Sequence, residues 1–329
     1  MFSQGSWHFT WYDAIFFDSN RIYIQHVTIS RIQLYKHIFN QDFIQCPPYR
    51  TVMFSKAVAQ VSKFTFPVVS SSLFCNGDVD SRCSAFIIIN KEGWAMTAGH
   101  VFDPYSKHQS DVAKINSVLR KDPSKTYWDM DPFWARKHSL WWSNDGSNMK
   151  DRYIDRQLDI CVGRLSKFDP KKMRNYPVFR DPNSLLPGTS LCRLGFPFVS
   201  VNTTYNDSTE QFVIDKDSLP IPIYPNEGMH TRDVIEGNSK NGNECLYVET
   251  STPGFKGQSG GPIFDMDGRI YAMQVKTTHM PLNFSPTVEY NGVTMVENQF
   301  INLGLGIHPR SIIRIFDDLG IDYEVSAPR

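Results

Sequence analysis

Export and membrane-spanning signals are absent from this sequence. The first residues lack a basic start, and their apolar patch, Ala14 to Phe17, is too short for a signal-peptide core and is flanked by Asp13 and Asp18. The longest uncharged apolar runs, such as Ala85 to Ile89, fall far short of the ~18 residues that span a bilayer. We therefore expect no export signal and no transmembrane helix.

Net charge is also absent. Lys and Arg together number 34, as do Asp and Glu, so the formal net charge is zero. Proteins that bind nucleic acids or anionic membranes rely on a positive field that this chain lacks. We expect neither a nucleic acid nor a membrane among its partners.

Cysteine is sparse. Six cysteines are spread over 329 residues without a CxxC pair, which favours free thiols in a reducing compartment over a disulfide framework. Cys75 and Cys83 bracket a turn-like stretch, but a metal would need two further ligands that the sequence does not supply. These features predict a cytoplasmic location and no metal site.

Short β-rich segments separated by Gly, Pro, Asn and Asp dominate the rest of the chain. Such punctuation is typical of a mainly β protein built as a sandwich or a barrel. Tight turns at 90–93 and 265–268 each join two of the segments as a hairpin. The predicted strands are Arg21–Tyr35, Val58–Val69, Ser84–Ile89, Trp94–Thr97, Leu158–Leu165, Thr189–Leu194, Cys245–Thr250, Pro262–Phe264 and Arg269–Val275.

Two segments have helical periodicity. One begins at a capping residue, Ser110, and ends before Pro123; the other runs from Pro309 to Leu319, with Gly320 as its stop. The stretch 122–155 is rich in Trp and charged residues, and the stretch 202–243 is rich in Pro, Asn and Gly; we interpret each as a long insertion between core strands.

The strongest chemical signal is the run Gly257-Gln258-Ser259-Gly260-Gly261-Pro262. Glycines around a serine allow a tight turn in which the N–H groups of Gly257 and Ser259 face one hollow, as in an oxyanion hole. A glycine-rich hairpin turn with no catalytic role is the alternative interpretation of these six residues.

A base and an orienting carboxylate have one candidate each. His100 ends a predicted strand, where its imidazole can project into a cleft, and Asp159 opens the apolar strand that follows it. The alternative interpretation, for each residue taken alone, is that His100 is a structural histidine and that Asp159 caps a turn at the start of a strand.

Taken together, in the order His, Asp, Ser, these elements resemble the trypsin/chymotrypsin-like serine protease superfamily, and specifically its bacterial, HtrA-type branch. Leu194-Gly195-Phe196-Pro197 and the short hairpin turn after the serine add to the likeness, which covers roughly Val58 to Tyr323. The resemblance implies two perpendicular six-stranded β-barrels with the active site between them.

The resemblance also implies a role for each candidate. Ser259 is the expected nucleophile, His100 the general base and then acid, and Asp159 the carboxylate that fixes the histidine tautomer, with Gly257 and Ser259 donating the oxyanion-hole N–H groups. No cofactor is implied.

The segment expected to bind the substrate strand falls near Gln274, Val275, Lys276 and Thr277. No side-chain role follows from this placement, and Lys276 has two possible directions, toward the specificity pocket or toward solvent.

The expected domain organisation follows from the extent of the likeness. Residues 58–323 form the peptidase domain, with a first barrel over about 58–165, a second over about 185–308 and a closing helix at 309–319. Residues 1–57 form an aromatic-rich extension that supplies either extra strands or a regulatory segment, and residues 324–329 form a tail. We expect no PDZ-like segment after the helix.

Two positions required a choice. Asp155 lies four residues before Asp159 and is a rival for the carboxylate role; we prefer Asp159 because it abuts an apolar strand, whereas Asp155 is expected in a charged loop screened by water. Gln258 stands where digestive relatives carry an Asp that pairs with a newly cleaved N-terminus, so that activation switch is not expected here.

The sequence therefore predicts a cytoplasmic, bacterial serine endopeptidase that acts on a protein or peptide substrate. One variant of this hypothesis is an enzyme gated by an activating protein partner or a signal. The alternative, from another functional class, is a catalytically silent trypsin-fold scaffold that binds a protein partner.

Overall fold

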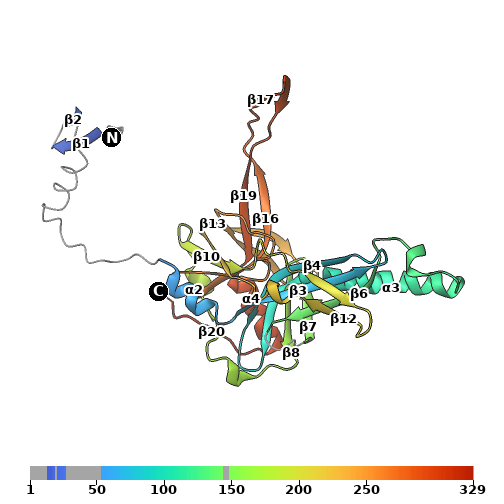
Figure 1. Ribbon diagram of the computed structural model, residues 1–329. Coiled ribbons are helices and arrows are strands. Elements are labelled where there is room, and N and C mark those ends of the chain that lie inside the picture. The colour runs from blue at the N-terminus through green and yellow to red at the C-terminus, as the bar shows by residue number, and fades with distance from the viewer. Residues whose placement is uncertain (1–12, 19–20, 27–52, 144–147, 329) are drawn as a thin grey trace, which may run out of the picture. The chain divides into compact units, whose positions relative to one another are not determined.

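The computed structural model describes residues 13–18, 21–26, 53–143 and 148–328, and the chain divides into two units, Met1–Val52 and Met53–Arg329. In the first unit, β1 (Asp13–Asp18) pairs with β2 (Arg21–His26) as an antiparallel hairpin (Figure 1). The strand predicted over Arg21–Tyr35 is thus found as far as His26, and its remainder lies outside the described residues.

The second unit begins earlier than expected. Helix α2 (Ser55–Val61) buries Ala57 and Val61 in the core of this unit, although the sequence pattern predicted an N-terminal extension to residue 57 and a strand from Val58. The strand begins only at Thr65. Short apolar runs of this kind fit either a buried helix or a strand, which explains the error.

Six antiparallel strands form the first sheet of this unit. Their order across the sheet is β6-β3-β4-β5-β8-β7, and β6 and β7, at its two edges, are not paired with each other in the described residues. The turn at 90–93 joins β4 to β5 as predicted, with Gly93 N–H donating to Asn90 O. The strands are β3 (Thr65–Phe74), β4 (Val79–Ile88), β5 (Trp94–Ala98), β6 (Ala135–Trp142), β7 (Met149–Asp155) and β8 (Ile160–Leu165).

Six strands of the second, eight-stranded sheet form a closed ring. The order β15-β10-β13-β14-β19-β16 returns to β15, and β9 and β20 continue the sheet outward from β16. The unit is therefore mainly β, and its two sheets correspond to the two barrels that the resemblance implied: the first is an open sheet of six strands, and the second closes as a ring of six strands with two more attached. The strands are β9 (Val178–Phe179), β10 (Ser190–Gly195), β13 (Tyr224–Asn238), β14 (Glu244–Thr250), β15 (Pro262–Phe264), β16 (Ile270–Pro281), β19 (Phe300–Ile307) and β20 (Glu324–Val325).

Both expected insertions contain core strands, which corrects their interpretation. Residues 122–155 include β6 and β7 of the first sheet, and residues 202–243 include β13 of the ring, besides the small hairpin of β11 (Thr203–Asn206) and β12 (Gln211–Ile214). Most of β13 is exposed, so it carries few apolar residues and has the composition of a loop. The expected tail likewise contains β20, which pairs with β9.

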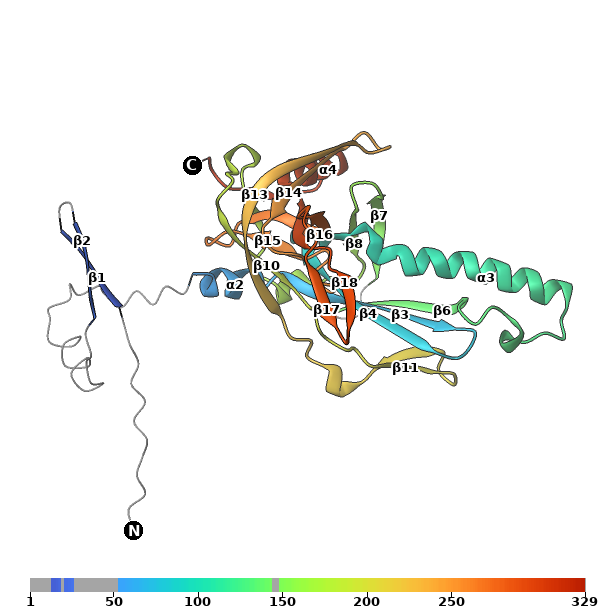
Figure 2. The same cartoon turned by 90° about the horizontal axis from the view of Figure 1, so that it is seen from above.

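Helix α3 (Asp103–Lys121) starts seven residues before the predicted cap at Ser110. Pro104 in its first turn and Asp103 at its N-terminus both favour this earlier start. The helix runs alongside β6 and β3 of the first sheet (Figure 2). The helix therefore begins three residues after His100, whereas the predicted start at Ser110 would have separated it from the histidine.

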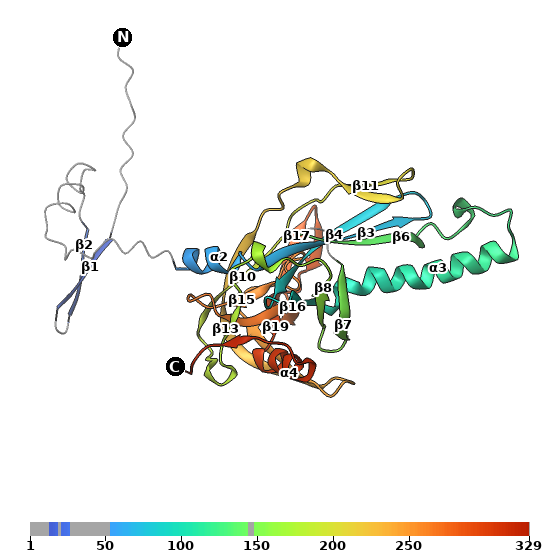
Figure 3. The same cartoon turned by 90° about the horizontal axis from the view of Figure 1, so that it is seen from below.

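Helix α4 spans Pro309–Leu319, the predicted range, and lies against the second sheet near β14 and β16 (Figure 3). Gly320 ends it in the left-handed conformation. Every helix in the described ranges is too short or too polar to cross a bilayer.

Strands β16 and β19 continue beyond the ring as a two-stranded arm (Figure 1). Its tip is the hairpin of β17 (Thr287–Tyr290) and β18 (Val293–Val296), which pair only with each other in the described part of the chain. One strand of the arm, β16, also contains the predicted substrate-binding segment, Gln274–Thr277.

Candidate active site

Asp159 and His100 are in direct contact. The Asp159 Oδ2 atom lies 2.8 Å from His100 Nδ1, and Oδ1 accepts from the His100 backbone N–H, also at 2.8 Å. His100 lies in the short 3₁₀ turn 99–102 after β5, and Asp159 lies just before β8, the strand that pairs with β5. With the carboxylate accepting at Nδ1, that nitrogen carries the proton and Nε2 is left free to accept one.

The environment of His100 makes it a stronger base than a free histidine. Partial burial lowers the pKa of His100, but the hydrogen bond and the charge of Asp159, helped by the charge of Asp103, outweigh this effect. The pKa of His100 is therefore raised above its ordinary value.

The turn that carries Ser259 is held by its backbone. Gly260 N–H donates to Gln274 O at 2.8 Å, Gly261 N–H donates to Gln258 O, and Ser259 O accepts from Ala85 N–H at 2.9 Å. Within the described residues, the backbone N–H groups of Gly257 and Ser259 donate no hydrogen bond to the protein. These are the two N–H groups that we expected from the sequence to be the oxyanion-hole donors.

Glycine is required at two positions of this turn. Gly257 has φ +98°, and a Cβ there would lie 2.4 Å from Phe196 O; Gly260 has φ +82°, and its Cβ would lie 2.2 Å from Ala85 O. The same absent atom on Gly260 would lie 3.0 Å from Ala98 N, two residues before His100. The serine turn thus packs directly on the end of the strand that presents the imidazole.

This packing brings the serine turn against the strand that precedes His100, but no hydrogen bond joins Ser259 Oγ to the imidazole in the described residues. Catalytic hydrogen bonds in enzymes without substrate are often long or poorly aligned. The geometry can support removal of the serine proton by His100 once the two side chains meet.

Comparison with known proteins assigns the chain to a family. The family description "Trypsin-like peptidase domain" matches residues 83–273, which is more than half of the chain. The chain belongs to this peptidase family. No curated protein matches it significantly.

Solved structures similar to the chain include two named proteases. The active form of the Rv3671c protease from M. tuberculosis is 11% identical, with a TM-score of 0.45, over 83% of this chain and 87% of that one. The HtrA-type protease AlgW with a tripeptide is 12% identical, with a TM-score of 0.42, over 81% of this chain and 64% of that one.

Asp155, the rival carboxylate of this peptidase domain, is buried rather than screened by water. Its side chain accepts from the N–H groups of Gln157 and Leu158, both at 3.1 Å, and from Ser239 and Asn243. Burial raises the pKa of Asp155, but these four hydrogen bonds outweigh it, so the pKa is lowered.

The reason given from the sequence for preferring Asp159 is therefore wrong. Asp155 is 1% exposed, whereas the Asp159 side chain is 21% exposed. Asp159 is distinguished by its contact with His100 and not by burial.

The side chain of Gln258 in the peptidase domain is fully buried, and one of its two polar atoms has a hydrogen-bond partner in the described residues. Its Oε1 accepts from Phe255 N–H at 2.9 Å, as expected for a neutral residue that needs no cationic partner. Its Nε2 has no hydrogen-bond partner in the described chain.

The predicted substrate-binding residues lie together on β16, next to the serine turn. Gln274 and Val275 are buried, and Lys276 and Thr277 are partly exposed. Lys276 Nζ pairs with Glu236 at 2.5 Å and lies 4.5 Å from the Tyr247 ring centroid, so its charge is already balanced within the protein. Thr277 Oγ1 donates to Gly254 O at 2.8 Å.

One group beside His100 was missed by sequence reasoning. Arg156 donates to Gly99 O at 3.1 Å and pairs with Asp103, which joins the β7–β8 connection to the start of α3 on either side of the histidine. These residues are more than fifty positions apart, so no local pattern reveals the contact.

Proposed function

We propose that this chain is a serine endopeptidase that hydrolyses peptide bonds through an acyl-enzyme. The observation that carries the proposal is the two-point contact of Asp159 with His100, together with a serine turn in which the N–H groups of Gly257 and Ser259 have no acceptor among the described residues. The proposed substrate is a protein or peptide, which agrees with the peptidase family to which the chain belongs.

The reaction begins when Ser259 Oγ attacks the carbonyl carbon of the scissile bond and its proton moves to His100 Nε2. The developing oxyanion accepts hydrogen bonds from the N–H groups of Gly257 and Ser259. Asp159 keeps the Nδ1 proton in place and stabilises the imidazolium that forms.

His100 then donates its proton to the leaving amine as the C–N bond breaks, which leaves an acyl ester on Ser259. Water attacks this ester, with His100 again taking the proton; His100 then returns it to Ser259 Oγ as the ester C–O bond breaks, and the carboxylic acid product leaves. Every proton in both steps is carried by His100, so its raised pKa sets the pH range of the reaction.

A fluorophosphonate probe and a peptide-hydrolysis assay test this proposal on the full chain. We expect wild-type protein to be labelled, and Ser259→Ala to lose labelling and on the order of 10⁴- to 10⁶-fold in turnover. Ser251→Ala is the matched control in the same segment, since Ser251 Oγ accepts a hydrogen bond from Met229 N–H on the neighbouring strand.

The outcomes separate the competing hypotheses. Labelling of the purified chain supports a constitutive peptidase, and labelling that needs a partner from lysate supports a gated one. No labelling of folded protein under either condition would leave the silent scaffold as the function. Turnover by Ser259→Ala above a tenth of wild type would remove Ser259 from the nucleophile role.

A further inference from the structure

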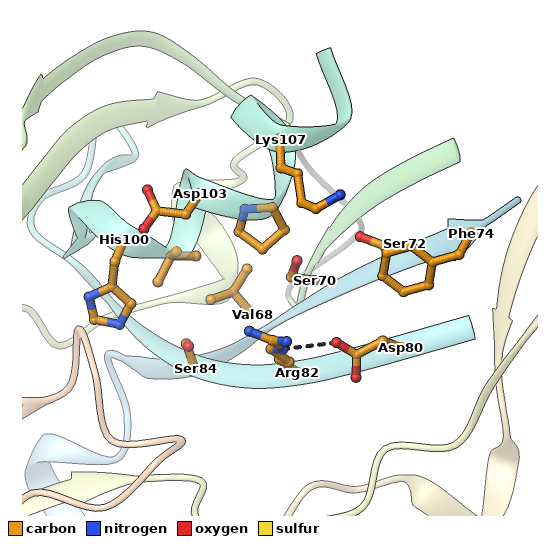
Figure 4. Close-up of a pocket in the computed structure, with 12 residues that line it drawn as sticks. Val68, Ser70, Ser72, Phe74, Asp80, Arg82, Ser84, His100, Asp103 and Lys107 are labelled. Carbon is orange, nitrogen blue, oxygen red and sulfur yellow. Dashed lines mark hydrogen bonds and ion pairs between the residues drawn. The ribbon is translucent and has the colours of Figure 1, made fainter. Parts of the chain in front are cut away.

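A cavity of about 390 Å³ lies between the β3–β4 hairpin and the start of α3, with His100 in its wall. Figure 4 shows His100 at one end of this cavity and Phe74 at the other. The volume lies within the ~300–1,000 Å³ range of sites that hold small ligands, which is enough for a short peptide segment.

The His100 end of the cavity adjoins the serine turn. Ser84 lines the cavity, and the next residue on the strand, Ala85, donates its N–H to Ser259 O at 2.9 Å. A peptide bound with its carbonyl at Ser259 therefore has the mouth of this cavity beside it.

The direction of the reaction decides which part of the peptide enters. His100 gives its proton to the leaving amine, so the leaving group must lie on the His100 side of the scissile bond. His100 itself lines the cavity, whereas β16, which the serine turn contacts through the hydrogen bond from Gly260 N–H to Gln274 O, contributes no residue to it. The cavity therefore lies on the path of the residues that follow the cut.

The lining of the cavity combines apolar side chains with charged side chains that are paired within the protein. Val68, Val101, Pro104 and Phe74 contribute the apolar surface, and Ser70 and Ser72 are short hydroxyl side chains. Within the described residues each of these charged wall side chains has a partner: Arg82 pairs with Asp80, Lys107 with Asp111, which Lys114 also contacts, and Asp103 with Arg156.

We propose that this cavity is the specificity site for the first two residues after the scissile bond, and that it selects apolar side chains there. The inference rests on the proposed peptidase function. A site whose charges are internally paired gains little from a charged ligand, whereas apolar surface in the cavity is removed from water when an apolar side chain enters.

Digestion of a random peptide library by the full chain tests the proposal, with the residues on both sides of each cut read by mass spectrometry. We expect Leu, Ile, Phe or Met in the first two positions after the cut. In matched single peptides, replacing such a residue by Ser should lower kcat/KM by at least about tenfold.

Two variants make the test specific. Ser70→Phe places a ring in the cavity and should reduce the apolar preference after the cut to less than about twofold, while the residues before the cut stay unchanged. Lys107→Glu should raise cleavage before Lys or Arg by roughly two- to fivefold through the new charge on the wall.

Lys114→Glu is the matched control for Lys107→Glu. Both lysines pair with Asp111 and are about half exposed, at 50% and 51%, but only Lys107 lines the cavity. Equal shifts in the two variants would overturn the proposal, because they would act through α3 and not through the cavity.

Failure of this inference is distinguishable from failure of the proposed function. A chain that takes the fluorophosphonate probe and cuts the library without any preference after the cut refutes the cavity's role alone. A chain that neither takes the probe nor cuts the library refutes the peptidase function and, with it, the inference.

Discussion

The two neighbouring carboxylates, Asp155 and Asp159, should respond to the same substitution in opposite ways. Each is changed to Asn, which keeps the size and one acceptor oxygen but replaces the other oxygen by a donor. Asn also tolerates the left-handed conformation of Asp159, whose φ is 65°, so the substitution adds little backbone strain.

At position 159 the cost falls on catalysis. The Asn oxygen can still accept from the His100 backbone N–H, but its amide donates to Nδ1 in place of accepting from it, and the ring proton moves to Nε2. Nε2 then cannot accept the proton of Ser259. We expect kcat to fall by roughly 10⁴, which corresponds to about 5 kcal/mol of transition-state stabilisation.

At position 155 the cost falls on stability. The new amide faces the amide donor of Asn243, which lies 2.8 Å from Asp155 Oδ2, inside a buried network. A buried donor left without an acceptor lowers the free energy of unfolding by about 1–3 kcal/mol. The melting temperature should fall by roughly 2–4 °C for each kcal/mol.

Thermal unfolding and peptide hydrolysis at 25 °C, measured on the same preparations, check both expectations. Asp159→Asn should unfold within a few degrees of wild type and be nearly inactive, whereas Asp155→Asn should melt earlier and keep most of its turnover. The reverse ranking of activities in two folded proteins would assign the orienting carboxylate to Asp155.

Three further predictions concern the base, the oxyanion turn and activation. Because the pKa of His100 is raised and the neutral ring is the base, kcat/KM should rise with pH through a midpoint above 6.5. Arg156→Gln should move this midpoint higher, since it removes a positive charge that lowers the pKa of His100. A pH profile with a midpoint at or below 6.5 would contradict the first expectation. Gly257→Ala should cost roughly 10²- to 10³-fold in kcat, since its Cβ would meet Phe196 O at 2.4 Å and shift the N–H donor, and wild-type turnover in this variant would show that the donor lies elsewhere. Because Gln258 is neutral and accepts from a backbone N–H, the full chain with a blocked N-terminus should take the fluorophosphonate probe as fast as a chain with a free one; labelling that appears only after proteolysis would identify a zymogen.

The parts of the protein that follow from local pattern were predictable from the sequence. The hairpin turns at 90–93 and 265–268 and the helix α4 depend on residues close together in the chain, and each is found where the pattern placed it. The three residues proposed for the triad come from short motifs; the structure brings two of them, His100 and Asp159, into direct contact, and the catalytic role of the three stays a prediction.

The remainder depends on pairing between distant segments, and only the tertiary structure decided it. β13 is a core strand because β10 and β14 hydrogen-bond to its backbone, although its exposed side chains have the composition of a loop. Asp155 is buried because Ser239 and Asn243, more than eighty residues away, reach its carboxylate. The cavity beside His100 exists because α3 begins at Asp103 and runs past β3, and no local pattern encodes which strand a helix will face.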